Sequence, residues 1–327
     1  MKDIKKIDLP PKNTSQSTIY RIKKSIKKAM PGAIKTCILI VSITVSISLL
    51  MVFFKYFNIM PYIANRLSPI FNKIGLPGEA ALAYVSGYFV NPYAAISVAA
   101  SLDLDYKAWT ILGVMVMCSH NMVTETTIQK KTGTSAWRMI IERTASAFIL
   151  AYILNLLMPE TASKISTTIS SLNTLSLVEL LKYWILDTIE LTIKMIIIIV
   201  GLSILQKFLA EFGIIEILSK IFSPILKIFG LHKKTSLLWI ITNTLGISYG
   251  AGIILEEVKN EKMDQKEVNL LNTHIAISHS NIEDIILFTT MGGVWYIMLL
   301  TRWILALILV WGYRLQYHIT DIIKKSI

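Results

Sequence analysis

The sequence predicts an all-α integral membrane protein with two inverted repeats, each holding three transmembrane helices and a broken re-entrant hairpin. The first observation is composition: of 327 residues, 54% are hydrophobic and 17% are charged, which is too apolar for an ordinary soluble fold. The second is a set of apolar runs of about the 20 residues that a helix needs to cross the hydrocarbon core. The third is a pattern that recurs in the two halves of the chain.

Residues 1–34 are expected to form a basic cytoplasmic N-terminal arm. The formal net charge of the chain is +12, and much of the excess lies in this arm, where the acidic residues are Asp3 and Asp8. A basic arm directly before a span is typical of a topology signal, so we favour this role over nucleic acid binding. The apolar run that follows has no small-residue cleavage site, which argues against a secretory signal.

The transmembrane spans are expected from the uncharged apolar runs. Residues 36–54, between Lys35 and Lys55, carry no charge and give the clearest span. Such a run is long enough to cross the membrane as a helix. Further spans are expected near residues 108–128, 137–158, 190–209, 268–289 and 293–313.

Two other apolar stretches are interrupted at their centres. Residues 80–102 contain Gly87, Asn91 and Pro92, and residues 235–255 contain a group of glycines that includes Gly246 and Gly250. Each stretch is therefore expected to form two half-helices joined by irregular backbone. Such backbone is tolerated at membrane depth only inside protein or beside water, and in inverted-repeat transporters it lines the substrate site.

The two halves of the chain share one register. The sequence SPIFNKIGL at 68–76 matches SPILKIFGL at 223–231, and further on His120 pairs with His279 and Arg143 with Arg302, each 159 residues apart. A register kept over so many positions indicates an internal repeat. The expected divisions are an arm at 1–34, repeat 1 at 35–157, a linker with an amphipathic helix at 158–189, repeat 2 at 190–315 and a cytoplasmic tail at 316–327.

Basic loops decide how the copies are oriented. If the hairpins are re-entrant, each copy crosses the membrane three times. Because three is an odd number, the second copy is then inverted relative to the first. In this arrangement the basic segments 129–138 and 207–234 lie in the cytoplasm together with both termini. If the hairpins cross fully, the copies are parallel and Lys131 and Lys233 lie outside, so we favour inversion. The expected location is the cell inner (cytoplasmic) membrane, with several crossings.

Several ionisable side chains lie inside the apolar runs. Each costs at least about 2.5 kcal/mol at the membrane centre, so such residues usually mark an ion or substrate path. In a continuous helix His120 stacks with Thr124, and Asn121 stacks with Glu125. The second copy has a comparable stripe. The predicted ion-coupling residues are His120, Asn121, Glu125, His279, Asn281, Glu283 and Asp284.

The predicted substrate-binding residues lie at the hairpin breaks and on the same polar stripe. They are Gly87, Asn91, Pro92, Asn243, Gly246, Ser248, Gly250, Ser119 and Ser278. Two structural alternatives stay open: the polar groups are hydrogen-bonding contacts between helices, or Glu125 pairs with Arg143 and Asp284 with Arg302 as matched salt bridges.

These features resemble the Gate domain shared by concentrative nucleoside transporters, the membrane part of the bacterial ferrous-iron transporter and several membrane proteins of spore-forming bacteria called nucleoside-recognition proteins. GYFVNPYAAI (87–96) is similar to the first gate motif of the iron transporter, but Val90 stands where that motif has cysteine. GISYGAGII (246–254) resembles the second gate motif, again without its cysteine. The chain also has no GxxxxGK[ST] loop, so the resemblance implies the fold rather than that transporter's mechanism.

The expected function is a Gate-domain permease that moves a small polar or ionic solute, which the resemblance suggests is nucleoside-like, through a midplane site between the hairpins. A divalent metal permease and a membrane scaffold are the alternatives. Enzyme activity is not expected, because HExxH is absent and Cys37 and Cys118 fit no metal or disulfide spacing. No cofactor beyond a coupling proton or cation and no metal site is assigned. The expected partners are the solute or ion and the lipid bilayer, a homo-oligomer is compatible with the sequence, and no nucleic acid partner is expected.

Overall fold

Helices recur in the same order in the two halves of the chain. The computed structural model describes residues 18–159, 176–247, 255 and 263–326, and within these ranges it contains helices and no strand. The all-α prediction is confirmed for this part of the chain. In the first half the elements are α1 (Thr18–Tyr56), α2 (Ile59–Phe71), η1 (Asn72–Ile74), α3 (Ala80–Phe89), α4 (Pro92–Ala99), α5 (Tyr106–Ser119), α6 (Met122–Lys131) and α7 (Ala136–Leu157). In the second half they are α9 (Leu177–Glu211), α10 (Ile214–Ile228), η2 (Lys233–Thr235), α11 (Ser236–Leu245), α13 (Gln265–Ser278), α14 (Glu283–Thr290) and α15 (Trp295–Ser326).

Four helices in the described ranges are long and apolar enough to cross a membrane, namely α1, α7, α9 and α15. They contain the spans expected at 36–54 and 190–209 in full, and those expected at 137–158 and 293–313 apart from one or two end residues. Two of them begin earlier than expected. The basic arm is helical from Thr18 and continues into α1, and α9 starts at Leu177, within the expected linker.

The start of α9 has a local cause. The side chain of Ser176 accepts a hydrogen bond from the Glu179 amide, and Glu179 Oε2 accepts one from the Ser176 amide at 2.8 Å. This reciprocal capping box satisfies two amides that a helix start leaves without partners. Residues 160–175 of the expected linker lie outside the described residues.

The spans expected at 108–128 and 268–289 are not continuous helices, so this prediction is wrong. The first divides into α5 and α6 at His120 and Asn121, and the second into α13 and α14 between His279 and Ile282. Asn121 and Ser280 have φ of 50° and 53°, and this left-handed conformation ends the helical hydrogen-bond ladder. The expected stacks of His120 on Thr124 and of Asn121 on Glu125 therefore do not lie on one helix.

The first broken hairpin is confirmed. Helix α3 ends at Phe89, and α4 begins at Pro92 after Asn91, whose side chain accepts a hydrogen bond from the Ala94 amide at 2.9 Å. Asparagine is a preferred N-cap, and proline suits the first helical position because its missing N–H would have no partner there. In the second hairpin α11 ends at Leu245, and its C-cap residue Gly246 has a φ of 88°. Ser248 and Gly250, like the rest of 248–254, lie outside the described residues.

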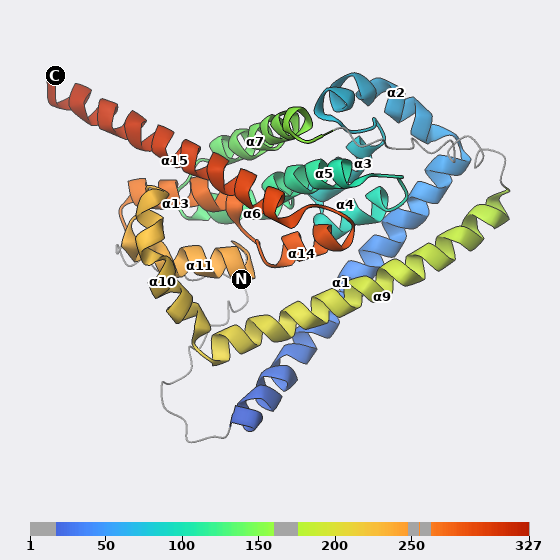
Figure 1. Cartoon of the computed structure of the whole chain (residues 1–327), viewed down its shortest axis with the longest axis horizontal. Coiled ribbons are helices and arrows are strands. Elements are labelled where there is room, and N and C mark those ends of the chain that lie inside the picture. The colour runs from blue at the N-terminus through green and yellow to red at the C-terminus, as the bar shows by residue number, and fades with distance from the viewer. Residues whose placement is uncertain (1–17, 160–175, 248–254, 256–262, 327) are drawn as a thin grey trace.

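Two pairs of long helices run in opposite directions in Figure 1. Helices α1 and α9 pack side by side, and in Figure 1 α1 runs from lower left to upper right whereas α9 returns. Helices α7 and α15 also run in opposite directions in this view. At the centre α5 contacts α7, α13, α14 and α15, and its residues from Lys107 to Ser119 are all buried. The core therefore lies where helices of the two halves meet.

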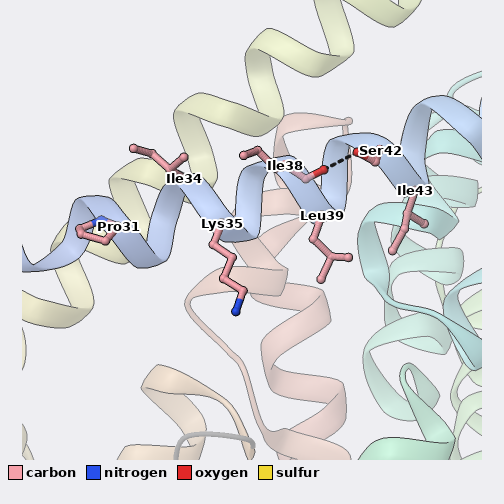
Figure 2. Close-up of a pocket in the computed structure, with 7 residues that line it drawn as sticks. All are labelled: Pro31, Ile34, Lys35, Ile38, Leu39, Ser42 and Ile43. Atoms are coloured by element: carbon pink, nitrogen blue, oxygen red, sulfur yellow. Dashed lines mark hydrogen bonds between the residues drawn. The ribbon is translucent and has the colours of Figure 1, made fainter.

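A groove of about 460 Å³ opens along α1, on the outside of this core. Its lining residues are Pro31, Ile34, Lys35, Ile38, Leu39, Ser42 and Ile43 (Figure 2). Most of these side chains are apolar, and none of the predicted site residues is among them. The predicted residues His120, Glu125, His279 and Asp284 are instead buried in the core.

Candidate functional site

Four ionisable side chains meet at the two helix breaks. His120 and Glu125 come from the α5–α6 break, and His279 and Asp284 come from the α13–α14 break, with each residue of the second pair 159 positions after its counterpart. All four are buried, with exposed fractions from 0% for His279 to 4% for His120 and Glu125. We call these four residues the central cluster. Each repeat supplies one histidine and one carboxylate.

Nitrogen and oxygen atoms in the central cluster lie close together. The Nε2 atoms of His120 and His279 are 3.3 Å apart. His279 Nε2 lies 3.2 Å from Glu125 Oε1 and 3.1 Å from its Oε2, and His120 Nε2 lies 3.3 Å from Glu125 Oε1. Asp284 Oδ2 is 3.7 Å from His120 Nε2. Glu125 thus contacts both rings, and Asp284 approaches the ring from the other repeat.

Backbone carbonyls orient both imidazole rings. His120 Nδ1 lies 3.1 Å from Val116 O, and His279 Nδ1 lies 2.7 Å from Ile275 O. A carbonyl oxygen can only accept a hydrogen bond, so Nδ1 must carry a proton in each ring. Neutral rings held in this way direct the bare lone pair of Nε2 toward the centre of the cluster.

Two buried arginines stabilise the breaks in equivalent ways. Arg143 donates to Cys118 O at 2.9 Å and to His120 O at 2.8 Å. Arg302 donates to Ile277 O and to His279 O, both at 2.6 Å. These carbonyls belong to the ends of α5 and α13, where the helical ladder leaves acceptors without partners. The arginines are therefore clamps that make a helix end possible in the protein interior.

The matched salt bridges, which the sequence left open as a structural alternative, form in one half of the chain only. Arg143 Nη2 lies 2.7 Å from Glu125 Oε2. In the other half, Arg302 Nη1 instead donates to Asn281 Oδ1 at 3.2 Å, and Asp284 Oδ2 is buried and accepts no hydrogen bond. The Glu125–Arg143 pair of this alternative is therefore present, whereas Arg302 binds Asn281 in place of Asp284.

The hairpins are tied directly to the helix breaks. The Asn121 amide donates to Gly87 O at 3.1 Å, and the Asn281 amide donates to Asn243 O at 2.9 Å. The side chains of Asn281 and Asn243 also bond to each other at 2.7 Å. The structure therefore brings Gly87 and Asn243 next to the breaks, as the prediction of a shared site requires.

Other predicted site residues have structural partners. Ser119 donates to Tyr84 Oη at 3.1 Å, and Ser278 Oγ lies 2.8 Å from His274 Nδ1. Glu283 stands apart from the central cluster and accepts a hydrogen bond from Tyr93 at 3.0 Å. Sequence reasoning did not identify Tyr84 or Tyr93, because each binds a residue far away in the chain. Their aromatic rings within an apolar hairpin gave no signal of a polar role.

The fold and the central cluster define a helical membrane protein with several apolar spans and a buried ionisable centre between two similar halves. Residues 37–159 match the Gate family, which is described as nucleoside recognition, and the resemblance inferred from the motifs is thereby confirmed for the first half. The chain is 26% identical over 283 residues to the uncharacterized membrane protein YvoD of Bacillus subtilis (strain 168), with 85% of this chain and 91% of YvoD covered. No solved structure gives a significant match.

Proposed function

We propose that the protein is a Gate-domain transporter that moves a small polar or ionic solute and binds a cation at the central cluster during the cycle. The observation that carries the proposal is the meeting of His120, Glu125, His279 and Asp284 in the core. Ionisable groups in membrane interiors usually belong to ion or substrate paths, because they are costly to keep there. The Gate match over residues 37–159 supports a transporter class.

Charge balance supports cation binding. In the described part of the chain, Arg143 pairs with Glu125, whereas Arg302 bonds carbonyls and Asn281. Asp284 Oδ2 accepts no hydrogen bond, so an ionised Asp284 is not neutralised by a guanidinium contact. A buried charge without compensation is strongly unfavourable, so the site has a physical reason to take up a cation.

The solute site is placed at the hairpin breaks beside the cluster. The backbone oxygens of Gly87 and Asn243 accept hydrogen bonds from amides at the same helix breaks that carry the histidines. Broken hairpins line the substrate site in inverted-repeat transporters. A solute bound near Gly87, Asn91 and Gly246 would therefore lie next to the cation site, which is the arrangement that coupling requires.

The inverted membrane orientation is part of the proposal. The antiparallel course of α1 and α9, and that of α7 and α15, supports two copies of opposite orientation (Figure 1). The basic segments 129–138 and 207–234 would then both face the cytoplasm, as the distribution of lysine and arginine in short loops requires.

Transport by purified protein in lipid vesicles tests the proposal. Uptake of labelled nucleosides and of small carboxylates is measured with and without a cation gradient, for wild type and for the double variant Glu283→Gln with Asp284→Asn. We expect uptake by wild type and loss of its cation dependence in the double variant. Asp103→Asn, which removes an exposed carboxylate, is the matched control. Absence of uptake for every solute, or full activity of the double variant, would contradict the proposal.

A divalent metal permease is the second candidate, and one observation favours it. His120, Glu125 and His279 offer ligand atoms that all lie within 4.8 Å of one another. Imidazole and carboxylate together suit zinc, iron, manganese or nickel. Vesicle uptake of these metals is therefore measured beside the organic solutes. A scaffold role, by contrast, would tolerate loss of the central cluster.

A further inference from the structure

We infer that the central cluster is a transition-metal site, in which His120, His279, Glu125 and Asp284 ligate one dication of the zinc or ferrous-iron type. The inference rests on the proposed function, because it names the cation that the transporter binds. It assigns a ligand role to each of the four side chains. It also explains why the two repeats place the same pair of residue types on opposite sides of one centre.

Both imidazole rings direct an Nε2 lone pair toward the centre of the cluster. Because Nδ1 of each ring donates to Val116 O or to Ile275 O, the Nε2 atoms of two neutral rings are both acceptors. These acceptors are only 3.3 Å apart, and the Glu125 carboxylate beside them also accepts. Such an arrangement is repulsive unless a positive centre lies between the atoms.

The spacing of these nitrogen and oxygen atoms also fits metal ligands. Ligands that lie about 2.0–2.1 Å from a tetrahedral zinc ion are about 3.3 Å from one another. His120 Nε2 and His279 Nε2 are 3.3 Å apart, and Glu125 oxygens lie 3.1 to 3.3 Å from the two nitrogens. A charge-assisted hydrogen bond is shorter, at about 2.7–2.9 Å. The distances therefore fit metal ligands better than a proton shared between the rings.

The position of Asp284 also fits a ligand role. Its Oδ2 is buried, accepts no hydrogen bond and lies 3.7 Å from His120 Nε2. Movement of this side chain toward the two Nε2 atoms would make it the fourth ligand. Asp284 is the repeat counterpart of Glu125, so the two copies would complete the site with one histidine and one carboxylate each.

Outer contacts of the kind found around metal ligands are also present. A ligating histidine commonly donates its other ring N–H to a carbonyl or carboxylate, and a ligating carboxylate is itself hydrogen-bonded. Both histidines have the carbonyl contact, and Arg143 holds Glu125 Oε2 at 2.7 Å. These contacts fix the ligands before an ion arrives, which favours binding.

The test uses the full-length protein in detergent, freed of metal with a chelator and then titrated with Co²⁺ alone. We expect one tightly bound Co²⁺ per chain, with the intense visible absorption of tetrahedral cobalt, and its displacement by Zn²⁺. His120→Gln and His279→Gln should each weaken binding by more than tenfold. His318→Gln, which alters an exposed histidine on α15, is the matched control and should bind like wild type.

Asp284→Asn serves as the second variant if the histidine variants do not fold, because it is isosteric and should shift the cobalt spectrum. Folded wild type that binds no Co²⁺, or equal binding by wild type and both histidine variants, would overturn the inference. If wild type takes up solute into vesicles but does not bind Co²⁺ in this way, the proposed transport function still holds. Stoichiometric Co²⁺ binding without uptake of any solute or metal would instead support the site and contradict transport.

Discussion

His120 and His279 face each other across the meeting point of the two halves, with their ring centroids 4.9 Å apart. His120 is the C-cap residue of the buried helix α5, and His279 is that of the buried helix α13. Each ring bonds through Nδ1 to a backbone carbonyl of its own helix. The two histidines are thus equivalent in sequence register, in local backbone and in orientation. The surroundings differ, since the carboxylate of Glu125 is held by an arginine and that of Asp284 is not.

This difference predicts that the energetic coupling between Arg143 and Glu125 is stronger than that between Arg302 and Asp284. Arg143→Met leaves the buried Glu125 without its partner and should lower the free energy of unfolding by about 3–5 kcal/mol. Adding Glu125→Gln should recover part of this loss, with an interaction energy of about 1–3 kcal/mol in a double-mutant cycle. Unfolding in detergent at several denaturant concentrations measures each variant.

The matched cycle uses Arg302→Met and Asp284→Asn. Arg302 bonds carbonyls and Asn281 rather than Asp284, so the interaction energy should stay within about 0.5 kcal/mol. Equal coupling in the two cycles would show that Asp284 pairs with Arg302 after all.

Gly87 is expected to be required for packing between the first hairpin and α5. A Cβ atom at this position would lie 2.9 Å from Val116 Cγ1 and 3.0 Å from Ala95 Cβ. Gly87→Ala should therefore lower the free energy of unfolding by about 1–3 kcal/mol, as overpacking does. The control is Gly201→Ala on α9, where nothing lies within 4 Å of the added atom and alanine improves helix propensity. Equal stability of the two variants in thermal unfolding would be evidence against close packing at Gly87.

Asn91 combines a structural role with a proposed solute contact, and two substitutions separate them. Asn91→Ala removes the oxygen that caps the Ala94 amide, so stability should fall by about 1 kcal/mol. Asn91→Asp keeps an acceptor oxygen and should retain the stability of wild type. We expect solute uptake in vesicles to fall in both variants, because aspartate loses the amide donor. Wild-type uptake by Asn91→Asp would restrict this residue to capping.

The membrane orientation can be tested by cysteine labelling of intact and permeabilised cells. Lys131→Cys and Lys233→Cys place thiols at exposed positions in the two basic segments, and both should react with an impermeant maleimide only after permeabilisation. Asp103→Cys lies between α4 and α5, on the side that the inverted orientation puts outside the cell, and should react in intact cells. The native Cys37 and Cys118 are buried, so background labelling should be low. Reaction of either lysine replacement from outside would exclude the inverted orientation.

Local sequence rules were sufficient for α1, α9, α15 and the first hairpin. An apolar run of membrane length satisfies its backbone by forming a helix, and Asn91 followed by Pro92 has the residues that a helix start needs. The ionisable stripe also identified His120, Glu125, His279 and Asp284, although as members of continuous helices. The arginines were recognised only as partners for carboxylates, because a side chain that binds distant carbonyls leaves no periodic pattern.

The sequence by itself therefore determined that the protein belongs in a membrane, and it determined the long helices, the repeat register and the residue types available at the centre. Tertiary structure alone decided where α5 and α13 end and which atoms meet there. No glycine or proline marks the breaks at His120 and His279. A helix can end in the interior only if its last carbonyls find other donors, and these come from Arg143 and Arg302, 23 residues beyond each histidine. Contacts over that separation depend on how α7 and α15 pack, which local propensity does not encode.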